Sequence, residues 1–390
     1  MMMLPAILLW ITLLLGQLGA IPLGSGVIVY IQDIVLCLMI LMTVVRYKFF
    51  TKLRGFRLVR PIALFVGLGV LSLVANYMRY PADVTGKGSL YLLRWMVYAG
   101  MYGVVIVSPL TKKFWLWWLG SFGIALSAIG LAQFFLYPDL RNLWYLGWDP
   151  HYYRVFATLL DPNYVGILLV LTIFVWMYLA VNNEKWRIRF VPFFIIAGIA
   201  FILTYSRSSY LALIAGVGVA IISLKQWKAG MFLILLFLLA IVYVPKPGGD
   251  TLSLDRYDST VSRIQNWEQT IMRIGERPVF GYGFNVVPFL DKEDASALPG
   301  RSGAGIDSSI LFIAVTTGFV GLLSYLWLMG KQITLANRLK DKTLAILLYA
   351  SFAAIFIHSL FVNSLFYPWA MVWMWVLVGV VEKENRSTYR

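Results

Sequence analysis

The sequence predicts an all-α, polytopic membrane protein with about twelve transmembrane helices and one large extracytoplasmic loop. Of its 390 residues, 60% are hydrophobic and only 13% are charged, and the mean hydropathy is +0.78. Soluble globular domains carry about 25% charged residues. Apolar runs long enough to cross a hydrocarbon core, about 20 residues each, recur along the whole chain. We therefore expect a single integral membrane domain over residues 1–390.

Each predicted span is an apolar run bounded by charged, aromatic or turn-forming residues, and Trp and Tyr mark several ends because they concentrate at membrane surfaces. In chain order the spans are 4–20, 26–45, 61–78, 90–110, 114–136, 163–181, 190–205, 209–224, 229–245, 308–329, 343–362 and 366–381. No basic residue precedes the first run, so we expect an uncleaved span there and not a signal peptide. Cys37 is the single cysteine, so no intramolecular disulfide can form.

The basic residues predict the orientation of these spans. The net charge of +15 comes from 33 Lys and Arg against 18 Asp and Glu, and the basic residues gather in alternate loops. Those loops are 46–60, 112–113, 185–189, 225–228, 331–342 and 383–390. Basic loops remain in the cytoplasm. We therefore expect both termini to be cytoplasmic, and we interpret the positive charge as a topology signal with no nucleic-acid partner.

The one long polar segment, residues 246–306, is the predicted extracytoplasmic loop. Loops of this length inside compact proteins are usually functional or disordered. Apolar residues recur in it at helical spacing, which predicts an amphipathic helix packed against the spans. The apolar stripe is Ile264, Trp267, Ile271 and Ile274. Arg263 and Glu268 flank the stripe, and Gly281 and Gly283 after it predict a tight turn or a close backbone approach.

Four arginines are predicted at the outer ends of spans or on the loop helix. They are Arg94, Arg154, Arg207 and Arg263. An ionisable side chain at membrane depth costs about 2.5–3.5 kcal/mol on insertion scales, so each marks a functional candidate unless it snorkels to the surface. Four arginines at one level indicate a shared anion. Asp161-Pro162-Asn163, shortly after Arg154, predicts a helix start whose free N–H groups favour phosphate, with an ordinary capped span as the alternative.

Polar residues around these arginines complete the predicted site. Ser206 precedes Arg207 in a hydroxyl-rich turn, and a guanidinium fork with hydroxyl groups suits a diphosphate, although a plain external turn has the same composition. Asp307 ends the long loop, where its carboxylate either accepts a proton from an attacking hydroxyl or caps the next helix. Gln133, a polar residue in an apolar span, is expected to line a groove for acceptor or lipid.

Taken in order, these motifs resemble the O-antigen ligase and polymerase superfamily. The motifs are Arg154 with Asp161-Pro162-Asn163, Thr204-x-Ser206-Arg207-Ser208, Arg263-x-x-x-Trp267, Pro278-x-x-Gly281-x-Gly283, Asp307-Ser308-Ser309 before Gly318-x-x-Gly321, and Asn363 with Phe366-Tyr367-Pro368. The resemblance implies a GT-C-like glycosyltransferase without metal or cofactor. It implies action at the outer face of the cytoplasmic membrane on a glycan linked to undecaprenyl diphosphate, with membrane lipid around it and a flippase and a chain-length regulator as partners.

The resemblance also implies roles for individual residues. Arg154, Arg207 and Arg263 would bind the diphosphate leaving group, because preorganised cations stabilise the departing charge. Ser206, Asn163, Arg94, Trp267, Glu268 and Gln133 would bind substrate. O-antigen ligases of the superfamily carry a His-Asn pair where this chain has Asp307-Ser308. That difference favours polymerisation of repeat units over ligation to another acceptor, and it leaves Glu268 as a competing base.

Two other classes of protein fit parts of the sequence. A secondary transporter with twelve spans would also have cytoplasmic termini, and its arginines could bind an anionic substrate. Against it, residues 1–195 and 196–390 show no internal repeat, and the long loop lies off-centre. A non-catalytic scaffold or flippase partner is the third class. Inactivity of every arginine variant in a glycan assay, despite normal complex assembly, would mark it.

Overall fold

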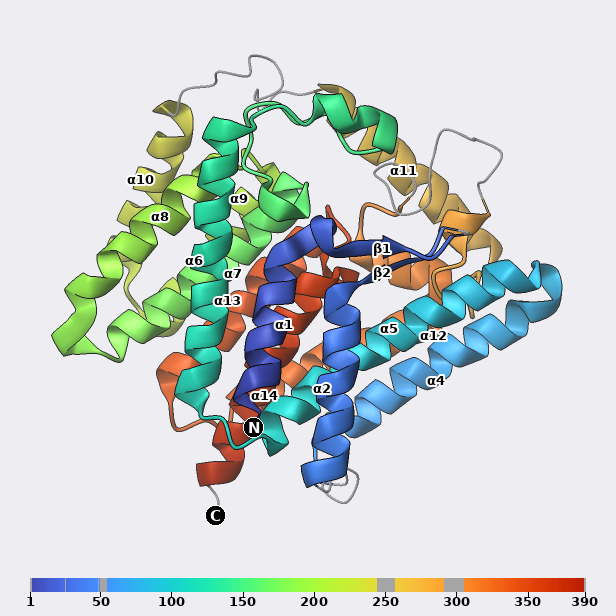
Figure 1. The fold of residues 1–390 in the computed structure, drawn as a ribbon, viewed down its shortest axis with the longest axis horizontal. Coiled ribbons are helices and arrows are strands. Elements are labelled where there is room, and N and C mark those ends of the chain that lie inside the picture. Colours follow the sequence, from blue (N-terminus) through green and yellow to red (C-terminus); the bar gives the residue numbers. More distant parts are fainter. Residues whose placement is uncertain are drawn as a thin grey trace.

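The computed structural model describes residues 2–24, 26–47, 49, 55–243, 257–290 and 305–388, and it is a bundle of helices (Figure 1). The helices are α1 (Met3–Leu15), α2 (Ile31–Tyr47), α4 (Val59–Asn76), α5 (Ala82–Val107), α6 (Lys112–Leu136), α7 (Pro162–Val181), α8 (Val191–Ile202), α9 (Arg207–Leu224), α10 (Trp227–Tyr243), α11 (Tyr257–Glu276), α12 (Ser309–Ala336), α13 (Lys342–Ser359) and α14 (Pro368–Thr388). Two short strands, β1 (Ala20–Pro22) and β2 (Ile28–Tyr30), form an antiparallel hairpin.

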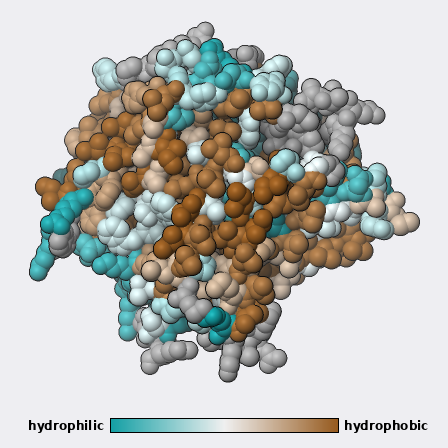
Figure 2. Space-filling model, in the orientation of Figure 1, coloured by the Kyte–Doolittle hydropathy of each residue, from teal (hydrophilic) through white to brown (hydrophobic). Residues whose placement is uncertain are grey.

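The structure confirms an all-α polytopic membrane protein. A described helix occupies each of the twelve predicted spans, and seven described helices are both long and apolar enough to cross a membrane. Large apolar side chains stand outward from them, for example Leu41 at 58% exposure, Val74 at 65% and Leu323 at 67%. Figure 2 shows this apolar surface as a broad band, with polar residues gathered toward its edges. Such a band suits lipid and would be a liability in water.

The hairpin is where the fold departs from the sequence prediction. The span predicted at 4–20 is α-helical only to Leu15, because Gly16 has a φ of 58° and a short 3-10 helix, Gly16–Gly19, leads to β1. The span predicted at 26–45 begins with β2, so its helix starts five residues later, at Ile31. Strands this short leave little apolar periodicity to detect, which is why the apolar pattern merged them with the adjoining helices.

Helix α7 is the centre of the bundle. Among the seven long, apolar helices described above it is the most hydrophobic, and 78% of its most apolar stretch is buried, against 33% for α4 and α9. A helix that is apolar on all sides belongs in a core. It packs against α6, α8, α9 and α13, while α14 packs on α5 and α6 and α12 packs on α4.

The two described ends of the chain lie on one side of the bundle, at the bottom of Figure 1, and α11 lies toward the opposite side. At the side with the chain ends, Lys112 pairs with Asp341 at 3.1 Å and with Glu384 at 2.8 Å. These ion pairs join the starts of α6 and α13 to the end of α14. They fall in the basic segments whose charge predicts a cytoplasmic location.

Helix α12 is broken at Gly318, and the break docks the polar loop onto the bundle. Gly318 has φ 68° and ψ −176° inside the helix. The freed backbone groups bond to the segment after α11: Phe319 N–H donates to Pro278 O at 2.8 Å, Tyr282 N–H to Val315 O at 2.8 Å, and Gly283 N–H to Thr316 O at 3.0 Å. The Pro278-x-x-Gly281-x-Gly283 and Gly318-x-x-Gly321 motifs of the sequence therefore contact each other through their backbones.

Side chains from α4 reinforce this contact. The Ser72 hydroxyl lies 2.6 Å from the carbonyl oxygens of Phe280 and Thr316, and Asn76 Nδ2 donates to Gly281 O at 3.1 Å. Arg277 Nη1 in turn donates to Asn76 Oδ1 at 2.7 Å. Because these bonds fix the end of α11, they also fix the position of the residues that α11 carries.

Replacing Gly318 or Gly281 by alanine is expected to lower the free energy of unfolding by about 1–3 kcal/mol through backbone strain, and further through a steric clash. Both glycines have positive φ, and an added Cβ would lie 2.0 Å from Val279 O at Gly318 and 2.5 Å from Val315 O at Gly281. The measurement is the apparent Tm of the purified protein. Gly67→Ala is the matched control, because nothing lies within 4 Å of its added Cβ. An equal Tm for Gly318→Ala and Gly67→Ala would contradict the docking contact.

Candidate functional site

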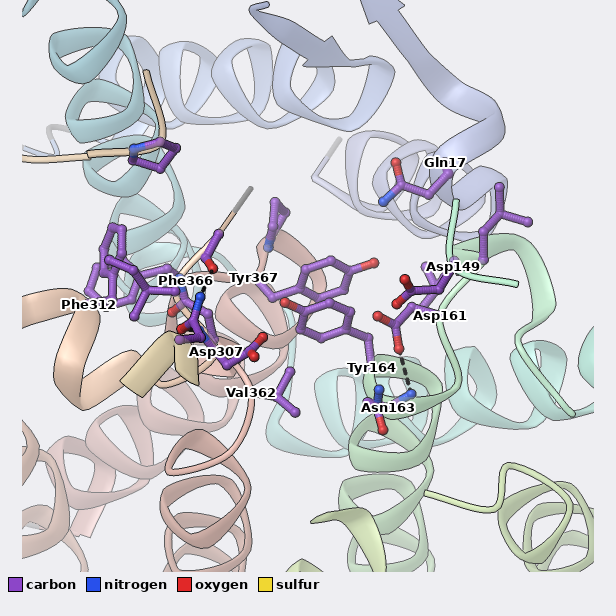
Figure 3. A pocket seen from close by; sticks show the side chains of 18 of the residues that line it. Gln17, Asp149, Asp161, Asn163, Tyr164, Asp307, Phe312, Val362, Phe366 and Tyr367 are labelled. Atoms are coloured by element: carbon purple, nitrogen blue, oxygen red, sulfur yellow. Dashed lines mark hydrogen bonds between the residues drawn. The ribbon is translucent and has the colours of Figure 1, made fainter. Parts of the chain in front are cut away.

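A cavity of about 870 Å³ lies on the α11 side of the bundle (Figure 3). It is lined by the hairpin, the 148–164 segment, the start of α9, α11, the segments around 285–289 and 305–307, and the turn before α14. All four predicted arginines line it, together with Asp307 and Asn163. Residues from distant parts of the sequence thus meet at one place, as a shared anion site requires.

Four helices begin at this cavity. Asn163 near the start of α7, Arg207 at the start of α9, Asp307 just before α12 and Pro368 at the start of α14 all line it. Three of the starts are capped by side chains: Asp161 accepts from Asn163 N–H at 2.7 Å, and Ser206 and Ser308 cap α9 and α12. Helix N-termini carry partial positive charge and favour anions, so the backbone adds to the arginine charge here.

Arg154 holds the turn before α9 in place. Its side chain is only 2% exposed, and it donates from Nε to Thr204 O at 2.9 Å and from Nη2 to Tyr205 O at 3.2 Å. His151 Nδ1 lies 3.4 Å from Nη1. Arg154 therefore positions the hydroxyl-rich turn and Arg207 beside it, and only part of its guanidinium faces the cavity.

Gln133 does not line the cavity, in contrast to the expectation of a groove residue. Its Oε1 accepts from Phe156 N–H at 2.9 Å and from Ala157 N–H at 3.1 Å, and its Nε2 donates to Arg154 O at 3.2 Å. A polar side chain in an apolar span is here a brace for the irregular segment that carries Arg154. Sequence alone cannot separate these two uses of a buried amide.

A chain of buried hydrogen bonds joins the starts of α7 and α9 to α13. Ser206 Oγ donates to Asn163 Oδ1 at 2.8 Å, and Ser209 Oγ donates to Ser206 Oγ at 2.9 Å and lies 3.2 Å from His358 Nε2. His358 Nδ1 meets Ser364 Oγ at 2.5 Å. Ser206 thus acts behind the cavity wall, and His358 is a hydrogen-bonded residue of the core.

Arg207, Arg263 and Asp307 are the charged residues best placed to meet a substrate. Both arginines are half-buried and line the cavity from different helices. Asp307 is not a helix cap, because Ser308 caps α12, so its carboxylate remains available to the cavity. Burial raises the pKa of the Asp307 carboxyl above its ordinary value, while the Arg263 charge lowers it and Asp149 raises it.

Arg94 lines the same cavity, but its charge is already balanced. It forms a salt bridge with Asp33 at 2.9 Å and donates to Ile28 O, and its guanidinium lies over the rings of Tyr30 and Tyr91. It therefore ties α5 to the hairpin and to α2. Of the four arginines expected to share one anion, this one contributes least positive charge to the cavity.

Trp267 and Glu268 are not among the residues that line the cavity. Trp267 is half-buried against Phe361, with ring centroids 6.0 Å apart, and Glu268 is exposed. The predicted apolar stripe of α11 is also rotated: Ile274 is buried, but Ile264 and Ile271 are 47% and 57% exposed. The physical reason is that the inner face of α11 lines a polar cavity, so Arg263 and its polar neighbours turn inward.

Two carboxylates and an aromatic row belong to the site although sequence analysis assigned them no role there. Asp149 and Asp161 line the cavity, and burial and the neighbouring Asp149 charge raise the pKa of Asp161 to about 6, against a lowering by Arg154. Tyr164 and Tyr367 stack with ring centroids 3.6 Å apart. The Phe366-Tyr367-Pro368 break and the Asp161-Pro162 pair were visible as motifs, but nothing in the sequence shows that they meet.

Within the described residues, no group of three or more His, Cys, Asp or Glu is arranged to hold a metal ion.

Comparison with known proteins gives two similarities. Residues 192–326 match the model of a family described as O-Antigen ligase, a stretch that holds Arg207, Arg263 and Asp307. The chain is also 23% identical over 248 residues to a ComP-specific O-oligosaccharyltransferase of Acinetobacter baylyi. That match covers 60% of this chain and 44% of the relative, so the chain matches less than half of the relative's length.

Gln133→Ala is expected to destabilise the protein by about 1–3 kcal/mol, because Phe156 N–H and Ala157 N–H would lose their acceptor in a buried segment. The measurement is again the apparent Tm, with Gln226→Ala as the control on an exposed side chain. Surface changes of that kind usually stay within about 0.5 kcal/mol. A Tm for Gln133→Ala that equals the control would show that the brace does not operate.

Proposed function

We propose that this chain, which is similar to the O-antigen ligase family over residues 192–326 and to an O-oligosaccharyltransferase, transfers a glycan from undecaprenyl diphosphate to an acceptor hydroxyl at the outer face of the cytoplasmic membrane. The observation that carries the proposal is the convergence of Arg207, Arg263 and the helix N-termini on one cavity of about 870 Å³. This arrangement suits a ligand with a compact double negative charge and a large polar remainder. A diphosphate-linked glycan has both properties.

In this proposal, Arg207 and Arg263 bind the two phosphates of the donor. A planar guanidinium can bond two phosphate oxygens at once, and the start of α9, where Arg207 is the first residue, adds the partial positive charge of a helix N-terminus. The negative charge on the bridging oxygen grows as its bond to the sugar breaks. Cations already in place stabilise that growth without reorganisation, which is the largest electrostatic demand of the reaction.

The transfer reaction requires one general base, which accepts the proton of the acceptor hydroxyl. The acceptor oxygen bonds to the anomeric carbon of the donor glycan while the bond between that carbon and the phosphate oxygen breaks. Undecaprenyl diphosphate leaves with the electron pair, and the acceptor hydroxyl gives its proton to the Asp307 carboxylate. Asp307 is placed for this step because it lines the cavity and burial raises its pKa. Glu268 is a weaker candidate for the base because it is exposed and outside the cavity lining.

Polymerisation of lipid-linked repeat units is the acceptor reaction we favour, because Asp307-Ser308 replaces the His-Asn pair of ligases. Ligation to a different acceptor is the second candidate, and a separate observation supports it: the matched family is described as a ligase and the similar protein is an O-oligosaccharyltransferase. In either case we place both termini in the cytoplasm, and a flippase and a chain-length regulator are the expected partners.

Purified protein supplied with an undecaprenyl-diphosphate-linked repeat unit and EDTA is expected to build a ladder of longer glycans. Arg207→Ala is expected to lower the rate by about 10²–10³-fold, the range for loss of one preorganised donor at a developing negative charge. Arg141→Ala is the matched control, because Arg141 is exposed and pairs with Asp139 outside the cavity. Transfer to an added second acceptor without a ladder would indicate ligation. No transfer to any acceptor would overturn the proposal.

The pH dependence tests the assignment of the base. Because Asp307 must be ionised to accept a proton, kcat/KM is expected to fall as pH drops through a pKa above the ordinary 3.8 of aspartate. Arg263→Gln removes the charge that lowers this pKa, so the acid limb should move to higher pH in that variant. Asp307→Asn should lose about 10²–10⁴-fold in rate. An acid limb that stays in place in Arg263→Gln would assign the titration to another group.

A further inference from the structure

The cavity has a second end whose chemistry differs from that of the arginines. Figure 3 shows Asp149 and Asp161 side by side on the far side of the stacked Tyr164 and Tyr367 rings from Asp307. Gln17, which follows α1, reaches the same end. The side chains gathered there are carboxylates, an amide and phenol groups, and the charge of Arg154 acts on Asp161.

A rigid row of aromatic rings forms one wall of this end. Tyr164 stacks on Tyr367 with an interplanar angle of 5°, Tyr367 lies 4.8 Å from Trp369, and Trp369 lies 5.1 Å from Tyr30. Trp369 is fixed by a hydrogen bond from Nε1 to Leu13 O at 2.7 Å, and the Tyr30 hydroxyl donates to Gln17 Oε1 at 3.0 Å. The row therefore presents its hydroxyl groups in set positions.

The hydroxyl of Tyr367 is a buried polar group at the cavity. The residue is only 9% exposed, and this hydroxyl makes no well-formed hydrogen bond to the described part of the chain, although the Gln17 side chain lies near it. In Figure 3 it is directed toward Asp149 and Asp161, with Gln17 facing it from the other side. Buried tyrosine hydroxyls usually have a partner. A hydroxyl of a bound molecule, placed among these groups, would supply one.

We propose that Gln17, Asp149, Asp161 and Tyr367 form a subsite for a neutral, hydroxyl-rich sugar ring of the acceptor. This subsite rests on the proposed glycan transfer and names its acceptor end. Carboxylate and amide oxygens accept hydrogen bonds from sugar hydroxyls, and the Tyr367 hydroxyl bonds a further one. The same carboxylates repel a diphosphate, so they keep the donor at the arginine end and orient the two substrates.

The test is binding of soluble sugar to protein in lipid nanodiscs, which contain no sugar-based detergent. The probes are the methyl glycosides of glucose, galactose and N-acetylglucosamine, measured by saturation-transfer NMR. Tyr367→Phe and Asp149→Asn are each expected to weaken the tightest probe by about 3- to 10-fold, the loss of one hydrogen bond. Tyr145→Phe is the control, since Tyr145 is 72% exposed and outside the cavity lining.

A second measurement separates this subsite from a structural role and from the donor site. Tyr367→Phe is expected to keep the affinity for undecaprenyl diphosphate and to lower the affinity for the sugar. Arg207→Ala is expected to lower the affinity for undecaprenyl diphosphate and to keep the affinity for the sugar. Absence of sugar binding by the wild type, or equal sugar binding by wild type, Tyr367→Phe and Asp149→Asn, would overturn the subsite. If the wild type does not bind undecaprenyl diphosphate, the proposed function itself is overturned.

Discussion

The candidate site depends on the backbone contact between the break in α12 and the segment that follows α11. Helix α11 carries Arg263, and its own Asn266 and Ile274 contact the rest of the chain. The backbone hydrogen bonds across the break at Gly318 fix the end of this helix on the bundle. A broken helix inside a membrane needs partners for its freed N–H and C=O groups. Here the polar loop supplies those partners, so the same contact satisfies the helix and positions the arginine.

The charged residues of the cavity also divide into those that hold the structure together and those that face a substrate. Arg94 is neutralised by Asp33 and Arg154 is largely occupied by the turn before α9, so these two arginines build the walls. Arg207 and Arg263 line the cavity from α9 and α11, and in the proposed function they bind the diphosphate. The carboxylates Asp149 and Asp161 stand apart from Asp307 across the tyrosine stack. The proposed function requires two chemically different substrates in one cavity. Placing positive and negative side chains at different ends of the cavity would direct each substrate to its own end.

Much of the fold could be predicted from the sequence, because apolar runs of membrane length report spans directly. The hairpin at Ala20–Pro22 and Ile28–Tyr30 could not, since two three-residue strands leave no periodic signal. The four arginines selected from the sequence line one cavity. The ordered motifs did not show that Gln133 is a brace, or that α11 turns Ile264 and Ile271 outward. Both depend on which side chain faces a polar cavity, and that is a property of the assembled structure.

The most direct test of the account is a cryo-EM structure of the protein in nanodiscs with undecaprenyl diphosphate bound. We predict density for the two phosphates within hydrogen-bond distance of the Arg207 and Arg263 guanidinium groups, at the start of α9. The docking contact around Gly318 should be present in the same map. Diphosphate density on the opposite side of the bundle, near the Lys112 cluster, or α11 bound elsewhere, would contradict the account.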